Sequence, residues 1–152
     1  LSTILVPIAD VLSPNVYELG HLTGLEVNSR AQAVEALHAL AKRTPARAII
    51  GTGIPDPDHP DELAVIALAR KSSGDTGTIS MAVTRRLPLF ASGTGDAFAA
   101  LFTARYLRDQ DLKAAIDAAV LGMSHIVTET AATNSDELRI IETQDKWVAA
   151  LG

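Results

Sequence analysis

A strand–helix–strand pattern near the start of the chain restricts the fold more than any other feature. Residues 11–12 end a short strand, residues 34–41 carry apolar side chains at the 3.6-residue period of a helix, and residues 46–51 form an apolar strand. Two strands joined through a helix are typical of a parallel sheet. The pattern therefore predicts an α/β protein with three α/β/α layers around a mostly parallel, Rossmann-like sheet.

The region after this unit predicts a hairpin. Residues 63–69 and 78–83 are apolar segments on either side of the polar turn 71–77, an order that is typical of two paired strands. Helix propensity leaves a helix over 63–69 as the alternative. A loop is expected over 53–60, because the prolines within it disrupt regular strand pairing.

Capping residues predict where several helices begin and end. Pro14 suits the first turn of a helix that Gly24 stops. Ser29 and Gln32 form a capping box for the next helix, and Asp111 caps a later one. Further helices are expected over 97–106, 136–141 and 144–151.

Composition and charge exclude several classes of protein. The 152 residues suffice for one domain with a core, and we expect residues 1–152 to form a single domain. A net charge of −5 without blocks of like charge argues against a nucleic-acid partner. No apolar run could span a membrane, and no signal peptide opens the chain. The absence of cysteine excludes disulfides and is compatible with the cytoplasm.

The first residues predict that the chain is part of a longer protein. The chain opens at Leu1 without a methionine, and the sequence is already apolar there. A processed terminus is the alternative. We therefore expect an apolar strip to be exposed where the remainder of the protein would pack.

The strongest chemical signal is Gly93-Thr94-Gly95-Asp96. Two glycines leave backbone N–H groups unobstructed, and a following helix adds unpaired N–H groups with a partial positive charge. These groups suit a transferring phosphate, and Asp96 could accept the proton of an attacking hydroxyl. The alternative is a tight turn in which Asp96 only favours the helix dipole. The helix over 97–106, expected to be buried on all sides, favours a rigid phosphate pocket.

A second signal is the helix start that contains Asn15 and Glu18. The two residues are three apart, share a helix face, and offer amide and carboxylate oxygens that suit Mg²⁺, often through water. Taken alone, the pair is more simply explained by Asn15 as the helix cap and Glu18 as an acid in the first turn that interacts favourably with the helix dipole. Thr52 follows a buried strand, where open parallel sheets bind ligands, although an ordinary turn is the simpler interpretation.

We expect these segments to converge at one edge of the sheet. Parallel strands place their carboxyl ends together, so Ser13 and Thr52 should meet Gly93–Asp96 there. The histidines lack metal-ligand spacing, and Arg85-Arg86 is more simply a solvated pair than a phosphate contact. The sequence contains neither a Gly-x4-Gly-Lys-Ser/Thr phosphate loop nor a His-Glu-x2-His zinc motif.

Taken together, the motifs resemble the pyridoxal kinases of the ribokinase superfamily. The glycine–aspartate motif at Gly93–Asp96 is specific to the superfamily, and the segments Ile8–Asn15 and Asp136–Ile141 point to pyridoxal kinases. The resemblance implies a ribokinase-like fold of which this chain is the C-terminal part. It also implies that the N-terminal half of such a kinase carries much of the sheet and the vitamin pocket.

The resemblance implies roles for individual residues. Asp96 corresponds to the base that deprotonates the substrate hydroxyl, and Gly93–Gly95 to the anion hole for the transferred phosphate. Glu18 with Asn15 matches the motif that organises Mg²⁺ and ATP. Some family members have lysine at the position of Thr52, and others have a hydroxyl residue there. The positions near the nucleotide phosphates or a monovalent cation such as K⁺ are Ser13 and Thr52.

The implied activity is ATP-dependent phosphorylation of the 5′-hydroxyl of pyridoxal, pyridoxine or pyridoxamine in vitamin B6 salvage. The resemblance further implies a homodimer in the cytoplasm. Two alternatives stay open: a ribokinase-like kinase for a hydroxymethylpyrimidine or a sugar, and a nucleotide- or anion-binding fragment without turnover.

Overall fold

The structure is a computed structural model that describes residues 4–72, 74–88 and 91–152. Its contacts divide the chain into two compact units, Leu1–Ala82 and Val83–Gly152. The first unit contains η1 (Val6–Ile8), β1 (Val11–Leu12), α1 (Val16–Thr23), α2 (Arg30–Ala41), β2 (Ala48–Pro55), β3 (Glu62–Ala69) and most of β4 (Thr78–Arg85). The second unit contains α3 (Thr94–Asp109), α4 (Leu112–Ala132) and α5 (Gln144–Leu151).

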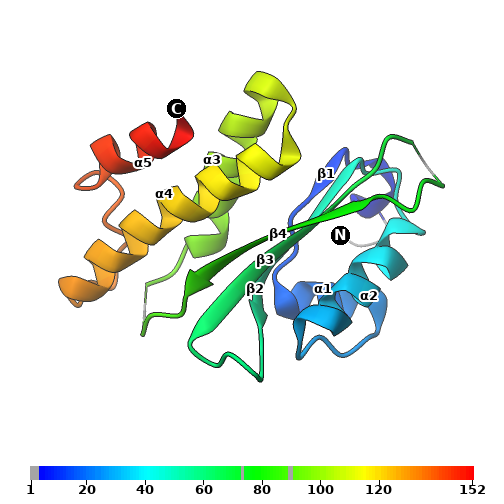
Figure 1. Cartoon of the computed structure of the whole chain (residues 1–152), viewed down its shortest axis with the longest axis horizontal. Helices are drawn as coiled ribbons and strands as arrows, with labels where there is room; N and C mark the ends of the chain where they lie inside the picture. The colour runs from blue at the N-terminus through cyan, green and yellow to red at the C-terminus, as the bar shows by residue number, and fades with distance from the viewer. Residues whose placement is uncertain (1–3, 73, 89–90) are drawn as a thin grey trace. The chain divides into compact units, whose positions relative to one another are not determined.

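The four strands form one sheet in the order β1–β2–β3–β4 (Figure 1). β1 and β2 run parallel, with Val11 opposite Ala48, and α2 lies between them in the chain. The predicted strand–helix–strand unit and the hairpin of β3 with β4 are therefore confirmed. β2 and β3 run antiparallel, so the sheet is mixed rather than mostly parallel. The reason is the short connection over 56–61, because a parallel return needs a much longer crossover.

The helices α1 and α2 pack on the sheet of the first unit (Figure 1). α2 contacts β2 and β3, while α1 contacts β2 and α2. Each fully buried leucine or isoleucine contributes about 1.5–3 kcal/mol, so this core fixes the strands firmly against the helices. The core includes Leu19, Leu37, Leu40, Ile49, Ile54 and Ile66.

A buried arginine joins the end of β3 to the end of α2. Arg70 is 7% exposed, and its guanidinium donates hydrogen bonds to carbonyl oxygens of Ala41 (2.6 Å), Thr44 (2.7 Å) and Ala46 (2.6 and 3.1 Å). Carbonyl groups at a helix C-terminus carry partial negative charge, so they balance the cation without a carboxylate. Arg70 thereby holds the end of α2 against the sheet.

Three predicted features of the first unit need correction. α1 begins after its cap Asn15 rather than at Pro14, although Gly24 ends it in the left-handed region as predicted (φ 75°). Ser29 caps α2, but the Gln32 side chain accepts from the backbone N–H of Asn28 instead of completing a capping box. β2 continues to residue 55, so the expected loop over 53–60 is shorter, because the strand pairs again after an irregularity.

The helices α3, α4 and α5 pack together in the second unit. Asp111 caps α4 as predicted, since its side chain accepts from the N–H of Ala114 at 3.0 Å. The expectation that the helix over 97–106 is buried on all sides is wrong for this chain: Phe102 is buried, whereas Ala100 is exposed. Alanine exposes little apolar area, so its presence does not require burial.

The segment between α4 and α5 forms turns instead of the helix expected over 136–141. Its backbone is tied to the end of α4, because the N–H of Arg139 donates to Thr130 Oγ1 at 3.0 Å and the N–H of Ser135 donates to the Thr130 carbonyl oxygen at 3.1 Å. The helix expected over 144–151 is present as α5. Among the described helices, none has the length and apolar character needed to cross a membrane.

Apolar side chains are exposed in the segment that leads into β1. Ile4, Leu5 and Ile8 are 68%, 50% and 71% exposed. β1 lies at one end of the strand order, with β2 as its neighbour. Exposed apolar side chains are thus present in the segment before this edge strand, and the apolar strip expected where another part of the protein would pack stays a prediction.

Candidate active site

Ser13, Asn15 and Thr52 lie together where β1 ends beside the middle of β2. The N–H of Thr52 donates to the carbonyl oxygen of Pro14 at 3.0 Å, and Asn15 forms an isolated parallel bridge with Thr52. The chain after β1 thus continues beside β2 before it turns into α1. Parallel pairing thus places the end of β1 beside Thr52, which lies within β2 and not after it as expected.

Asn15 and Glu18 form a reciprocal capping box at the start of α1. The N–H of Asn15 donates to Glu18 Oε2, and the N–H of Glu18 donates to Asn15 Oδ1, each at 2.9 Å. The capping interpretation is therefore correct. It does not exclude a second role, because both residues are exposed and a carboxylate has more acceptor sites than the cap uses.

The hydroxyl oxygen of Ser13 is buried and has no hydrogen-bond partner in the described part of the chain. A buried polar atom without a partner costs about 1–3 kcal/mol. Such atoms are rare in folded proteins and call for an explanation such as a bound water or ion. Ser13 therefore offers an unused donor and acceptor directly beside the end of β1.

A β-bulge displaces Thr52 from the ladder between β2 and β3. Gly51 pairs with Ile66 and Ile54 pairs with Ala64, so β2 contains one residue more than β3 over this stretch. Gly53 has φ 67°, a conformation that glycine adopts at little cost. Bulges of this kind redirect side chains and are frequent beside active sites.

The helix α3 begins at a glycine instead of a capping side chain. Gly93 is the N-cap with φ 88°, and no side chain caps the first turn. The helices α1, α2 and α4 begin with side-chain caps from Asn15, Ser29 and Asp111. A Cβ added at Gly95 would meet no atom of the described residues within 4 Å. The first N–H groups of α3 are therefore open to an anion.

Asp96 lies in the first turn of α3 and is exposed. In the described part of the chain it makes no hydrogen bond or ion pair. Behind it, the rings of Phe98, Phe102 and Tyr106 stack along the helix with centroids 6.3 and 5.4 Å apart. An unengaged carboxylate beside open N–H groups, on a helix anchored by buried rings, can accept a proton from a hydroxyl group.

The predicted site residues thus form two sets. Ser13, Asn15, Glu18 and Thr52 belong to the first unit, and Gly93–Asp96 to the second. Their meeting around one phosphate stays a prediction. The bulge at Gly53 was missed, and its signal was a glycine inside the strand.

The described residues contain no group of three or more His, Cys, Asp or Glu side chains that could hold a metal ion. The pair Asn15 and Glu18 offers oxygen ligands only. Mg²⁺ prefers oxygen, keeps several waters, and often binds through one or two carboxylates together with substrate phosphates. The pair therefore fits a Mg²⁺ ion that arrives with a nucleotide, and does not fit a resident metal held by protein alone.

Comparisons with known proteins agree on one family. A family model described as phosphomethylpyrimidine kinase matches residues 1–140. The pyridoxal kinase PdxY of Leifsonia xyli is 35% identical over 144 residues, which cover 92% of this chain and 47% of that protein. The chain therefore spans about half the length of the curated relatives that it matches.

Solved structures show the same fold. Pyridoxal kinase from Trypanosoma brucei superposes with a TM-score of 0.83 at 23% identity, covering 95% of this chain and 50% of that one. Pyridoxal kinase from Leishmania donovani, in complex with ADP and pyridoxine, superposes with a TM-score of 0.79 at 25% identity, covering 91% and 46%. The predicted α/β fold of ribokinase type and the resemblance to pyridoxal kinases are confirmed.

Proposed function

Because this chain belongs to the phosphomethylpyrimidine kinase family, we propose that it is the nucleotide-binding and catalytic part of an ATP-dependent kinase for pyridoxal or a closely related vitamer. The observation that carries the proposal is the start of α3. Its N–H groups lack a side-chain cap, and the adjacent Asp96 is unengaged among the described residues. Phosphoryl transfer needs both an anion-stabilising site and a group that accepts the proton of the attacking hydroxyl.

Asp96 acts as the base in this proposal. It takes the proton of the 5′-hydroxyl of the vitamer as the hydroxyl oxygen attacks the γ-phosphorus of ATP, and ADP leaves. The N–H groups of Gly93–Gly95 stabilise the negative charge on the transferred phosphate. The buried rings of α3 keep these groups in place, so little reorganisation is required during the reaction.

The first unit binds the nucleotide. Ser13 and Thr52 contact its phosphates or a monovalent cation such as K⁺. Either contact would give the buried Ser13 hydroxyl the binding partner that it lacks among the described residues. Glu18, with Asn15, would hold Mg²⁺ directly or through water, and the ion would neutralise charge on the phosphates. By family resemblance we expect a homodimer in the cytoplasm.

A hydroxymethylpyrimidine is the second candidate acceptor, because the matching family is described as phosphomethylpyrimidine kinase. ATP consumption by the full-length protein with pyridoxal, hydroxymethylpyrimidine and ribose tests the proposal. We expect the highest kcat/KM with pyridoxal. A preference for the pyrimidine would support the second candidate, and the absence of turnover with all three would leave a nucleotide-binding module.

Glu18→Gln is expected to raise the Mg²⁺ concentration for half-maximal rate about tenfold, because the ion loses a charged group that holds it directly or through a bound water. Glutamine can still accept from the N–H of Asn15, so the helix cap is kept while the charge is removed. Glu35→Gln, on the exposed part of α2, is the matched control. An unchanged Mg²⁺ titration for Glu18→Gln would leave Glu18 as a helix cap alone.

A further inference from the structure

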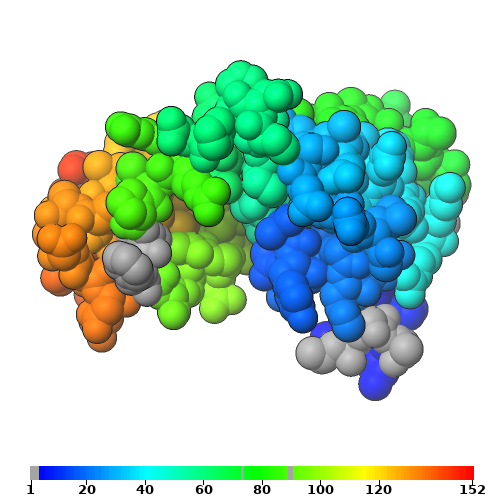
Figure 2. Space-filling model, turned by 90° about the horizontal axis from the view of Figure 1, so that it is seen from below, coloured from blue at the N-terminus to red at the C-terminus, as the bar shows by residue number. Residues whose placement is uncertain are grey.

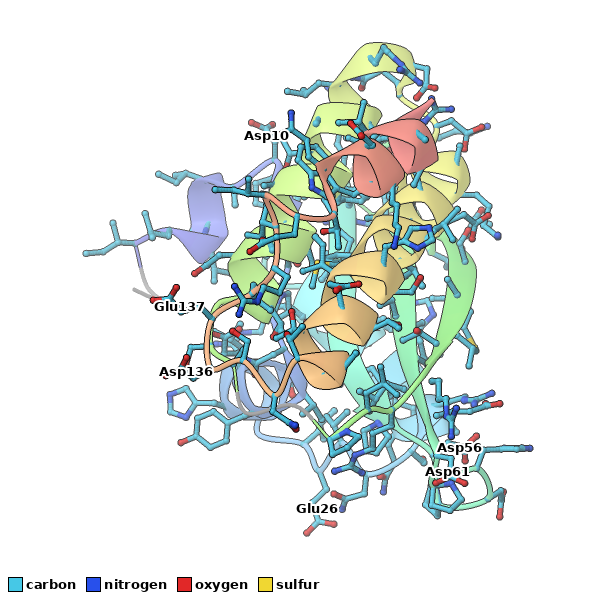
Figure 3. All side chains as sticks on the ribbon, turned by 90° about the vertical axis from the view of Figure 1, so that its left-hand side faces the viewer. Asp10, Glu26, Asp56, Asp61, Asp136 and Glu137 are labelled. Carbon is cyan, nitrogen blue, oxygen red and sulfur yellow. The ribbon has the colours of Figure 1, made fainter. Side chains whose placement is uncertain are left out.

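Arg30, the first residue of α2, holds both ends of the connection between β2 and β3. Its Nη2 donates to Glu62 Oε2 at 2.6 Å, and its Nε lies 2.9 Å from Asp56 Oδ2. Asp56 directly follows β2 and Glu62 begins β3. Figure 3 labels Asp56 and Asp61 near the two ends of this connection, which projects from the surface in Figure 2 (turquoise).

Arg30, Asp56, His59 and Glu62 form what we call the Arg30 cluster, and Asp56 is at its centre. Its side chain is 12% exposed, and its Oδ2 also lies 3.1 Å from His59 Nδ1, while Oδ1 accepts from the N–H of Asp58 at 3.2 Å. The hydrogen bond with His59 is the main cause that lowers the pKa of Asp56, and the Arg30 charge acts in the same direction. The carboxylate is therefore ionised when it meets Arg30 at neutral pH.

The cluster lies directly beyond the β-bulge that contains Thr52. Over the bulge, the pairing of β2 with β3 stops after Gly51 and resumes at Ile54. The N–H of Thr52 donates to Pro14 and Thr52 bridges Asn15, while Gly53 is in the left-handed region. The conformation of the Thr52–Gly53 segment therefore depends on how firmly β2 is held on both sides of it. The buried core holds β2 on both sides of Thr52, since Ile54 is buried and pairs with Ala64. The contacts of Arg30 with Asp56 and Glu62 are a further tie, at the end of β2 after the bulge.

We propose that Arg30 is a positioning residue for nucleotide binding, which acts by fixing the bulged Thr52–Gly53 segment through Asp56 and Glu62. The inference rests on the proposed function, because Thr52 is assigned there to the nucleotide phosphates. Arginine suits this task, since its planar guanidinium can face two carboxylates at once, whereas lysine offers a single point charge. The Nε–H of Arg30 forms an ion pair with Asp56 but no hydrogen bond. The hydrogen bond of this cluster from Arg30 is the one that Nη2 donates to Glu62.

The test is a double-mutant cycle on ADP binding by the full-length protein, measured by calorimetry well below the unfolding temperature. Arg30→Ala is expected to raise the Kd for ADP about three- to tenfold, the size of coupling between connected residues. In the Thr52→Ala background the same substitution should change Kd by less than twofold. Arg47→Ala, at an exposed arginine before β2, is the matched control.

Each outcome separates the inference from the proposed function. If the unsubstituted protein does not bind ADP, the proposed function fails. The positioning role is wrong if ADP binds but Arg30→Ala and Arg47→Ala have the same Kd for ADP. It is also wrong if Arg30→Ala raises the Kd by the same factor in the original protein and in the Thr52→Ala background. Should Arg30→Ala fail to fold, Glu62→Gln and Arg30→Lys replace it in the cycle, with the same criterion. Steady-state rates should show the effect in the KM for ATP with kcat nearly unchanged.

Discussion

Replacement of Asp96 by asparagine is expected to lower kcat of the full-length kinase by about 10²–10⁴-fold, which is the usual contribution of a positioned acid–base group. Asparagine keeps the size and polarity of the side chain but cannot accept the hydroxyl proton. ATP binding should remain nearly intact, because the N–H groups at the start of α3 are unchanged. Steady-state kinetics together with binding of an ATP analogue measures both effects.

Asp145→Asn provides the matched control, since Asp145 is also an exposed acid in the first turn of a helix. If both residues only favour the helix dipole, the two substitutions should have similarly small effects on rate and stability. Retention of most of kcat in Asp96→Asn would remove the base from the proposed mechanism. A lost affinity for the ATP analogue would instead make Asp96 part of the nucleotide site.

The parts of the fold that could be predicted rest on local signals. The period of the helix over 34–41 and the apolar run over 46–51 are properties of neighbouring residues, and both elements are present as α2 and β2. Gly24 and Asp111 likewise act within one turn of their own helices. Signals of this range survive folding because tertiary contacts reinforce them instead of competing with them.

Three of the misses have a different origin, since each depends on a contact with residues outside the segment itself. Residues 136–141 have helical composition, yet their backbone is tied to Thr130 at the end of α4. Residues 53–55 contain glycine and proline, yet they stay in β2 because β3 supplies partners after the bulge. Arg30 has no local sign of its role, because its carboxylate partners come from the β2–β3 connection.

The same limit applies to the candidate site. Ser13, Asn15 and Glu18 are close in sequence, so their proximity could be predicted, and parallel pairing adds Thr52. The glycine–aspartate motif at Gly93–Asp96 can be identified from the sequence without the structure. Whether that motif meets the first set depends on the packing of the two units, for which no local pattern exists.

Arg70→Met is expected to lower the free energy of unfolding by about 1–3 kcal/mol, the cost of leaving buried acceptors without their donors. Methionine fills a similar volume but leaves the carbonyl oxygens of Ala41, Thr44 and Ala46 without the donors that Arg70 supplies. These carbonyls lie at and after the end of α2, so the helix should also lose its hold on the sheet. Urea unfolding followed by circular dichroism measures the change.

Arg47→Met is the control, because Arg47 is exposed at the start of the same strand region and its change should cost within about 0.5 kcal/mol. Arg70→Lys should fall between the two, since a single ammonium group cannot reach all three carbonyl oxygens as the guanidinium does. Equal unfolding free energies for Arg70→Met and Arg47→Met would show that α2 is held by its apolar face alone. In that case the buried arginine would contribute to the choice of fold but not to its stability.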